Sequence, residues 1–515
     1  MQEVRRKIIA CFLLLTSCFL FAAPLDNIPT NSWIYDAIDY LKTAGNIKSI
    51  PPTSKPWTRQ EVVELLKESG INKTYANSQA GFYIAQLLSQ FSDDLLMDLD
   101  IPKPNPVYRL NYGEGDILFD YFVRLDHNNI QNTFSPNGHW LFPDNQTGSL
   151  GAIFNLDQSS KISFYNLFDL AFRRKNSPDT TDVAGIHFPG TRDKSYSNHV
   201  TMDCKQAYIT CPFYFLTLQV GRDYLYFGSG YRSSVLLSDI APSMDQMQLR
   251  AEKKNYKALW FCAALSPYNY FHRFLSGQRL EVSIGNNLRL GGSMLVIYSY
   301  DSSQTRGFFG YLNPIIPIYA EVSNTGHDDN ILFGFDFSFY LKSVKFYGQL
   351  MLDNYEFNSR PNRPPNAYGL TFGTYVPINQ FALRSEYSKI TRYTYYHRIY
   401  HIAYTQYSVP LGHALGPDAD EIFCRFEYYP INTLCVSLVG TMTRRGDGNR
   451  GDLDNKTWDA DEQPIREFPS GTIETSTLIG PEIYFQPLHD VRILGGIYCN
   501  NDKEIESFVR LEYRY

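Results

Sequence analysis

The sequence of 515 residues lacks any long apolar run beyond Phe21. A helix that spans a membrane needs about 18 or more uninterrupted apolar residues, so this absence excludes a helical membrane protein. The sequence also lacks an excess of positive charge, because its formal net charge is -6 at pH 7. Nucleic-acid binding relies on neutralising phosphates with lysine and arginine. No nucleic-acid partner is therefore expected.

The motifs of common enzyme classes are missing as well. There is no G-x-S-x-G nucleophile elbow, no H-E-x-x-H zinc helix and no phosphate-binding P-loop. The ten histidines are scattered without the spacing of metal ligands. The acidic residues of segment 447–462 could bind calcium, but the EF-hand spacing is absent and a solvated loop explains them adequately. We predict a protein that is not an enzyme and that needs no metal and no cofactor.

Cysteine is scarce too, with eight residues in the chain. Two of them, Cys11 and Cys18, lie in an N-terminal segment that we expect to be removed. Cys204 and Cys211 could close a small disulfide loop in an oxidising compartment. Two free thiols are an equally good interpretation of this pair.

The N-terminus carries a secretory signal. A basic stretch at residues 5–7 precedes an apolar run over residues 8–21, and two alanines follow. That order predicts a signal peptide over residues 1–22 and export of the remaining chain. Cys18 could alternatively be a lipidated cysteine, but strongly apolar residues follow it, and we favour the ordinary signal peptide.

Residues 23–104 are predicted to form a small helical domain. Apolar residues recur every three or four positions over residues 31–45, 59–68 and 78–96, which is the periodicity of amphipathic helices. Thr58 is the expected N-cap of the second helix. Prolines separate the first two helices and then end the helical region, where they form the domain linker.

After the linker, in residues 105–515, the apolar period changes to two. Phenylalanine alternates with glycine, aspartate and serine over residues 333–339. Residues 279–284, 381–387 and 422–428 alternate in the same way, with arginine and glutamate on the second face. This period predicts strands with one apolar and one polar face. Charges on the polar face imply water or paired charges on that side.

Alternation alone does not distinguish a soluble β-sandwich from a membrane barrel. The last segment favours the barrel, because residues 509–515 alternate apolar with charged residues and end on Tyr515. Such an end resembles the terminal strand that the outer-membrane barrel assembly machinery reads. Strands of about 10 residues would give roughly 16 to 18 strands. We predict an all-β transmembrane barrel in outer-membrane lipid, with a small N-terminal α-helical periplasmic domain.

The first two helices also carry a resemblance of their own. Trp33 begins the first, and residues 57–61 open the second with Trp-Thr-Arg-Gln-Glu. This pair looks like a single surface-layer-homology module, which implies binding to peptidoglycan through residues 31–96. A plain periplasmic three-helix bundle that stabilises the mouth of the barrel is the alternative, and we favour it.

The most informative segment is residues 221–230, which reads Gly-Arg-Asp-Tyr-Leu-Tyr-Phe-Gly-Ser-Gly. Together with residues 410–421, it resembles the Wzi family of outer-membrane capsule-assembly proteins. Phe227 and Ser229 replace the tryptophan and the proline of the family's turn. The positions that match the family motif are Gly221, Gly228, Gly230, Gly416, Pro417 and Asp418.

The resemblance implies an 18-stranded barrel of a Gram-negative outer membrane that acts as a lectin-like anchor for surface polysaccharide and assists capsule assembly. The residues themselves offer a compatible mechanism. Aromatic rings present apolar faces to sugar C–H groups, while arginine and aspartate bind hydroxyls. The candidate residues are Arg222, Asp223, Tyr224, Tyr226 and Tyr231. A buried arginine–carboxylate network that plugs the lumen is the alternative role for the same residues.

Two further functions remain open at the level of sequence, a diffusion porin for small solutes and an outer-membrane hydrolase. The sequence nominates no Ser-His pair for hydrolysis. Charged residues on the polar face of many strands favour a plugged binding barrel over an open pore.

Overall fold

The computed structural model describes most of the chain after the predicted signal peptide. The described residues are 26–69, 79–91, 109–112, 115–128, 146–157, 163–174, 198–253, 255–300, 308–326, 328–354, 366–397, 399–431, 433–449, 465, 467–488, 491–501 and 503–514. The predicted signal peptide, the domain linker, most of the acidic segment and Tyr515 lie outside these residues.

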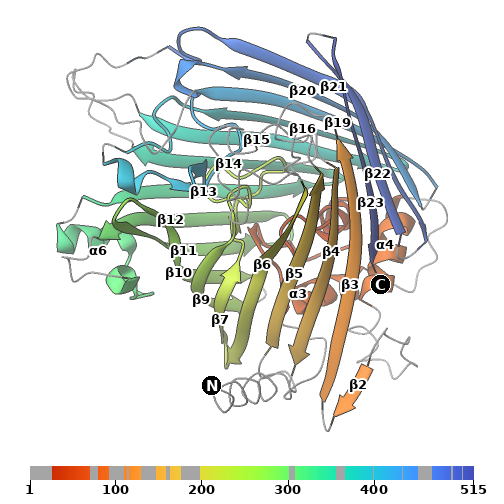
Figure 1. The fold of residues 1–515 in the computed structure, drawn as a ribbon, viewed down its shortest axis with the longest axis horizontal. Helices are drawn as coiled ribbons and strands as arrows, with labels where there is room; N and C mark the ends of the chain where they lie inside the picture. The colour runs from red at the N-terminus through yellow and green to blue at the C-terminus, as the bar shows by residue number, and fades with distance from the viewer. Residues whose placement is uncertain are drawn as a thin grey trace.

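Eighteen antiparallel strands, counted over the described residues, form one closed ring (Figure 1). Neighbours in the chain are neighbours in the ring, and the last strand, β23 (Ile505–Arg514), pairs with the first, β3 (Gly115–Asn128). That pairing runs from Phe508 opposite Asn128 to Arg514 opposite Phe122. Within the described residues, the short strand β2 (Arg109–Tyr112) pairs with β3 alone. The predicted barrel is confirmed.

The other strands of the ring are long and are joined in chain order. They are β4 (Gln146–Asp157), β5 (Ser163–Arg174), β6 (Asn198–Phe213), β7 (Leu216–Asp223), β9 (Met244–Lys253), β10 (Tyr256–Tyr268), β11 (Phe271–Ile284), β12 (Leu288–Tyr300), β13 (Asn330–Leu341), β14 (Val344–Asn354), β15 (Ala367–Ile378), β16 (Phe381–Ile390), β19 (Ala419–Ile431), β20 (Leu434–Arg445), β21 (Glu474–Leu488) and β22 (Val491–Asn500).

The barrel wall is apolar outside and polar inside, as β13 shows. Phe335 is 54% exposed, whereas Asp336, the next residue, is 7% exposed. A soluble sandwich would bury the phenylalanine and expose the aspartate. The same inversion recurs around the ring, where exposed apolar residues face away from the lumen and charged residues are buried in it. This inversion is typical of a wall surrounded by lipid, and it decides between sandwich and barrel.

The two ends of the barrel differ. At one end the strands are joined by short turns, as between β13 and β14 or between β15 and β16. At the other end long connections join β7 to β9, β12 to β13 and β16 to β19. We call these the short-turn end and the long-loop end. The asymmetry matters because outer-membrane barrels have short turns on one side of the membrane and long loops on the other.

The helical domain consists of α2 (Ile34–Thr43), α3 (Arg59–Glu68) and α4 (Gln79–Gln90). All three predicted helices are present. Thr58 forms a capping box with Glu61, in which each side chain binds the other's backbone N–H. Among the described residues, no helix is long and apolar enough to cross a membrane.

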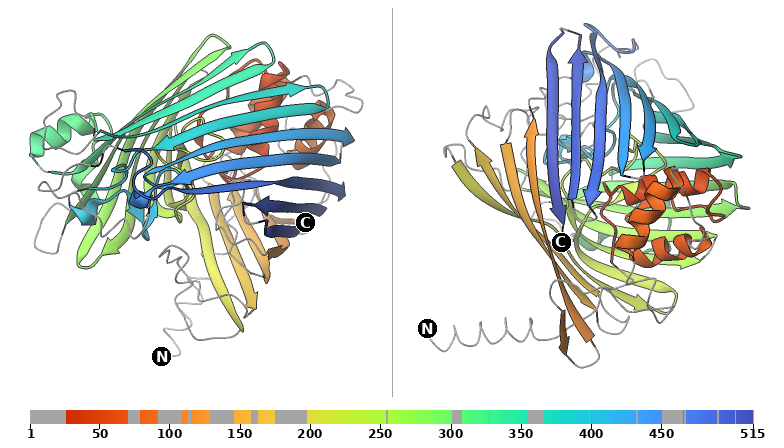
Figure 2. Two further views of the ribbon diagram at one scale, coloured as in Figure 1. Left: turned by 90° about the horizontal axis from the view of Figure 1, so that it is seen from above. Right: turned by 90° about the vertical axis from the view of Figure 1, so that its right-hand side faces the viewer.

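The helical domain packs against the short-turn end of the barrel. Buried residues of α2 and α4 form one apolar cluster with Tyr375, Ala382 and Tyr429 of the barrel wall. Figure 2 shows these helices against the inner side of the ring. Lys42 of α2 also donates a hydrogen bond of 2.9 Å to the carbonyl oxygen of Asn286, in the turn between β11 and β12.

Candidate functional site

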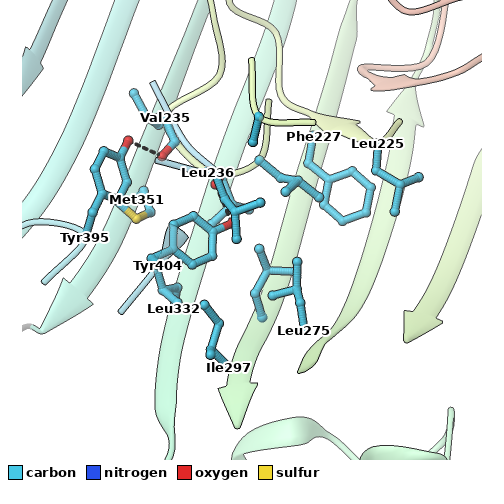
Figure 3. Close-up of a cluster of buried hydrophobic side chains, with 14 of the residues drawn as sticks. Leu225, Phe227, Val235, Leu236, Leu275, Ile297, Leu332, Met351, Tyr395 and Tyr404 are labelled. Carbon is cyan, nitrogen blue, oxygen red and sulfur yellow. Dashed lines mark hydrogen bonds between the residues drawn. The ribbon is translucent and has the colours of Figure 1, made fainter. Parts of the chain in front are cut away.

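The predicted motif lies mostly in a segment that leaves the wall and enters the lumen. We call residues 224–243, between β7 and β9, the plug segment; it contains the short strand β8 (Tyr226–Phe227). Apolar residues of the plug segment pack against residues of the wall that face the lumen (Figure 3). The cluster in that view comprises Leu225, Phe227, Val235, Leu236, Leu275, Ile297, Leu332, Met351, Tyr395 and Tyr404.

Glycines let the plug segment turn and approach the wall closely. Gly228 has a φ of 139°, a conformation that residues with a Cβ rarely adopt. A Cβ on Gly230 would overlap with the carbonyl oxygen of Ser233 and the side chain of Gln349. Gln349 in turn accepts a hydrogen bond of 3.0 Å from the backbone N–H of Val235. The two motif glycines therefore shape the turn that meets β14.

Carboxylates on the far wall hold the tip of the plug segment. Glu386 of β16 accepts hydrogen bonds from the backbone N–H groups of Tyr231 (2.7 Å) and Arg232 (3.1 Å). Glu421 of β19 binds the Arg232 guanidinium in a bidentate pair of 2.9 and 3.2 Å. Because these strands lie across the ring from β7, the plug segment spans the lumen.

The connection between β16 and β19, residues 391–418, covers the plug segment from the long-loop end. We call it the outer loop; it contains η2 (Tyr400–Ile402), β17 (Thr405–Gln406) and β18 (Val409–Pro410). The Tyr395 hydroxyl donates to the carbonyl of Val235 at 2.8 Å, and the Tyr404 hydroxyl donates to that of Leu236 at 2.6 Å (Figure 3).

The second part of the family motif ends the outer loop. Gly416 and Asp418 both have positive φ angles, 69° and 55°. Asp418 is fully buried and accepts hydrogen bonds from the backbone N–H groups of Gly448 (2.9 Å) and Ser470 (3.1 Å). Together with Pro417 between them, these residues fasten the outer loop to the connection between β20 and β21.

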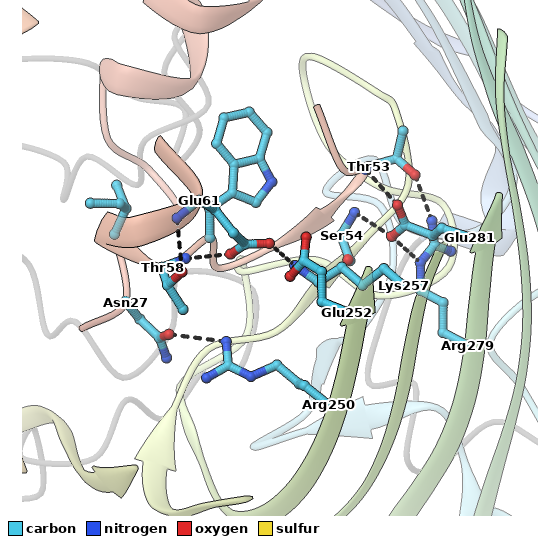
Figure 4. A network of polar contacts seen from close by, with 12 residues as sticks. Asn27, Thr53, Ser54, Thr58, Glu61, Arg250, Glu252, Lys257, Arg279 and Glu281 are labelled. Carbon is cyan, nitrogen blue, oxygen red and sulfur yellow. Dashed lines mark hydrogen bonds and ion pairs between the residues drawn. The ribbon is translucent and has the colours of Figure 1, made fainter. Parts of the chain in front are cut away.

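The helical domain closes the other side of the plug segment. Ser54 and Lys55 form the strand β1 (Ser54–Lys55), which pairs with β8 of the plug segment. Glu281 of β11 accepts hydrogen bonds from the backbone N–H groups of Thr53 (3.0 Å) and Ser54 (2.8 Å) (Figure 4). Residues 51–56, the proline-flanked connector between α2 and α3, are thus held inside the barrel.

Buried charges of the wall complete this contact. Glu281 also pairs with Arg279 (2.9 Å) and Arg289 (2.7 Å). Lys257 of β10 forms an ion pair with Glu61, the residue of the α3 capping box (Figure 4). Burial by itself raises the pKa of Glu61, but the attraction of the Lys257 ammonium outweighs it and lowers the pKa below its ordinary value. The Glu61 carboxyl is therefore ionised at neutral pH.

The five candidate binding residues do not share one environment. Asp223 is fully buried and accepts hydrogen bonds from Gln206 (2.7 Å), Gln219 (2.8 Å) and Asn27 (2.7 Å). Arg222, the preceding residue on β7, faces the opposite side of the wall. It forms a bidentate pair of 2.8 Å with the exposed Asp245.

The three tyrosines among the candidates lie in the plug segment. Tyr226 is buried and donates a hydrogen bond of 2.7 Å to the carbonyl of Gly230, and burial raises the pKa of its hydroxyl well above the usual value. The ring of Tyr231 lies 4.1 Å from the Arg384 guanidinium. Tyr224 is half-buried next to Asp223, whose side chain accepts its backbone N–H at 2.8 Å.

Exposed aromatic residues also lie outside the plug segment, at the long-loop end. Tyr270 is 69% exposed and Tyr400 is 40% exposed. The His401 ring stacks on Phe271 with 3.8 Å between centroids, and the Tyr400 ring lies 5.1 Å from that of Tyr268. We call these five residues the outer aromatic cluster. Sequence analysis missed it, because its members come from a tight turn and from a distant loop.

Cysteine and histidine form no further site in the described part of the chain. Cys204 and Cys211 lie on the single strand β6 and are not joined by a disulfide, so the disulfide interpretation is wrong. Burial lowers the pKa of His413 to about 4, and its imidazole is neutral at pH 7. Among the described residues, no three His, Cys, Asp or Glu side chains are arranged to hold a metal ion.

A closed strand ring with a lipid-type outer face and a lumen crossed by its own chain defines a plugged transmembrane β-barrel. The model of one family, capsule assembly protein Wzi, matches residues 180–499. The chain belongs to this family, as its motifs indicated. No curated protein sequence gives a significant match.

A solved structure agrees on the fold. The chain is similar to Wzi of Escherichia coli, described as an outer-membrane protein involved in group 1 capsule assembly and as a carbohydrate-binding β-barrel. That match has a TM-score of 0.63 and 17% identity, and covers 95% of this chain and 99% of that chain. Weaker matches are OccAB4 of Acinetobacter baumannii (TM-score 0.43, 10% identity, 80% and 100% coverage) and OccD3 of Pseudomonas aeruginosa (0.44, 11%, 81% and 95%).

Proposed function

We propose that this protein is a non-enzymatic outer-membrane barrel that binds surface polysaccharide at its long-loop end and assists capsule assembly. The observation that carries the proposal is the contrast between the filled lumen of the barrel and its long-loop end. The plug segment, the outer loop and the helical domain fill the lumen with buried contacts. At the long-loop end, beyond these contacts, the outer aromatic cluster exposes the rings of Tyr270 and Tyr400.

The outer aromatic cluster has the chemistry that sugars need. The exposed rings of Tyr270 and Tyr400 present flat apolar faces to sugar C–H groups, and their hydroxyls exchange hydrogen bonds with sugar hydroxyls. The stacked pair of Phe271 and His401 holds the outer loop beside the turn that carries Tyr270. A polymer can reach these rings without any rearrangement of the plug segment.

In this proposal, the residues predicted from the motif belong to the buried network that plugs the lumen, which is the alternative role predicted for them. Asp223, Tyr226 and Tyr231 are buried or half-buried among protein partners, and they serve the network that fixes the plug segment. Arg222 stiffens the rim of the wall through Asp245. The outer aromatic cluster, rather than these residues, makes the direct contacts with sugar.

The proposed orientation follows from the ends of the barrel. Short turns of outer-membrane barrels face the periplasm, so the helical domain lies in the periplasm and the outer loop faces the cell exterior. The barrel assembly machinery would recognise the chain through its last strand, in which Val509 and Leu511 face outward. Binding of peptidoglycan through residues 31–96 stays a prediction.

A diffusion porin is the alternative function. It would need a continuous water-filled path, whereas inward-facing charges such as Arg279, Glu281 and Asp336 are paired and buried. Unpaired charges beside water are what a conducting pore would use. The observed pairing favours a binding barrel.

The test of the proposed function is deletion of the gene in the bacterium that encodes the protein. The amounts of surface glycan on washed cells and in the medium are measured by immunoblot. We expect glycan to move from cells to medium, and expect the full-length protein supplied in trans to restore it. Unchanged attachment and amount after deletion would contradict the proposal.

A further inference from the structure

A segment outside the barrel covers part of its outer wall. The connection between β12 and β13 contains η1 (Phe308–Tyr311) and α6 (Ile318–Thr325). We call residues 308–326 the strap. Figure 1 shows α6 beside β10, β11 and β12, and contacts between α6 and β12 agree with that view.

The alternation of side chains along the strands shows that the strap covers the outer side of the wall. On β11, Arg279 and Glu281 face the lumen, so Phe274, Ser276 and Gln278 face outward. The residues of β10 and β12 that lie opposite them also face outward. They are nevertheless buried. They form a cluster with the strap that comprises Trp260, Cys262, Phe274, Val296, Tyr298, Tyr311 and Ile318.

The other face of the strap is apolar and uncovered. Ile315 is 86% exposed, Tyr319 is 58% exposed and Leu312 is 40% exposed. The strap holds no lysine or arginine, and Glu321 is its single acidic residue. A water-exposed loop normally carries polar residues at such positions, so this face is built for an apolar neighbour.

Backbone polar groups of the strap have hydrogen-bond partners within the protein, as a medium without water requires. The Gln278 side chain donates to the carbonyls of Pro314 (3.1 Å) and Ile316 (2.7 Å) and accepts from the N–H of Ile318 (3.3 Å). Asn313 accepts from the N–H of Ile315 at 2.9 Å. Irregular backbone is tolerated beside hydrocarbon only when its polar groups have such internal partners.

The exposed face of the strap is continuous with the apolar outer belt of the barrel. The Tyr319 ring lies 6.0 Å from that of Phe333 on β13, which faces outward. The next outward residue on that strand is the exposed Phe335. We infer that residues 312–319 are a membrane anchor outside the barrel, which inserts Leu312, Ile315 and Tyr319 among the acyl chains of the surrounding lipid.

Fluorescence quenching by brominated lipid tests this inference. Full-length Ile315→Trp is reconstituted into phosphatidylcholine vesicles with or without bromine on the acyl chains, and the signal of the wild-type protein is subtracted. Ile422→Trp, in the outward belt, is the positive control, and Glu467→Trp, in an exposed outer connection, is the negative control. Tyr319→Trp is a second strap variant that keeps an aromatic ring.

We expect bromine to quench both strap variants at least half as strongly as Ile422→Trp, and expect it to leave Glu467→Trp unchanged. Quenching of both strap variants no greater than that of Glu467→Trp would overturn the anchor. A second copy of the chain that covers the strap would also overturn it; a photocrosslinker at position 315 would then give covalent dimers together with weak quenching.

Discussion

Glu281, in the barrel wall, accepts a hydrogen bond of 2.8 Å from the backbone N–H of Ser54, in the connector of the helical domain. The same carboxylate pairs with Arg279 and Arg289 and is fully buried. One wall residue thus neutralises two buried guanidinium groups and also fixes the helical domain.

Replacement of Glu281 should therefore destabilise the protein strongly. Glu281→Gln keeps the shape of the side chain but leaves the Arg289 guanidinium without its carboxylate. Removal of one partner from a buried ion pair typically costs about 3–5 kcal/mol. We expect a loss of this size in the free energy of unfolding, measured by urea titration in detergent. Glu467→Gln, at an exposed site, should change it by less than about 0.5 kcal/mol.

The contact between Glu61 and Lys257 predicts a dependence on pH. The pKa of Glu61 is lower in the folded protein than in the unfolded chain, because the Lys257 ammonium outweighs the effect of burial. Its stabilisation is complete above the unfolded pKa, roughly 4.3, and is lost as the pH falls through the folded value.

Acidification from pH 7 toward pH 3 should thus lower the free energy of unfolding more in the wild-type protein than in Glu61→Gln. Urea titrations at several pH values measure the two slopes. Parallel slopes would refute the predicted role of this pair.

Gly230 should not tolerate a methyl group. In Gly230→Ala the added Cβ would overlap with the carbonyl oxygen of Ser233, so the turn against Gln349 must shift. Overpacking of this kind costs about 1–3 kcal/mol. Gly292→Ala is the matched control in the wall, since a Cβ there meets no atom within 4 Å. Thermal unfolding in detergent should separate the two variants, and equal melting temperatures would contradict the close approach.

The filled lumen predicts an electrically silent protein. Purified full-length protein inserted into a planar bilayer should give no stable open steps, whereas an open porin measured in the same way gives them. Insertion is verified separately by protease protection in vesicles. Reproducible open steps of the wild-type protein would favour the porin alternative.

Local patterns were sufficient to predict the N-terminal helices and the alternating strands of the barrel wall. The period of two marked strands such as β13, where Phe335 and Asp336 face opposite sides. Thr58 marked the start of α3, because capping is a property of neighbouring residues. Arg222 and Asp223 are adjacent residues of β7 and therefore face opposite sides of the wall. The sequence motif did not show that the strand extends to Asp223, so both residues were predicted to lie in one site.

The plug segment could not be predicted in this way. Its partners are remote in sequence: Glu386 lies 155 residues from Tyr231, and Glu421 lies 189 residues from Arg232. Residues 231–243 also show neither helical nor strand periodicity. The outer aromatic cluster is hidden for the same reason, because Phe271 and His401 meet only when the barrel has closed.

The most direct test of the proposed function is binding of purified full-length protein to surface polysaccharide purified from the same bacterium, measured by affinity electrophoresis. Each stacked aromatic contact contributes about 0.5–1.5 kcal/mol, so loss of two rings should cost about 1–3 kcal/mol and weaken binding by roughly 5- to 150-fold. We predict that weakening for the double variant Tyr270→Ala, Tyr400→Ala, and wild-type binding for Tyr319→Ala on the strap. Equal affinity of the double variant and the wild-type protein, or no binding by either, would contradict the account.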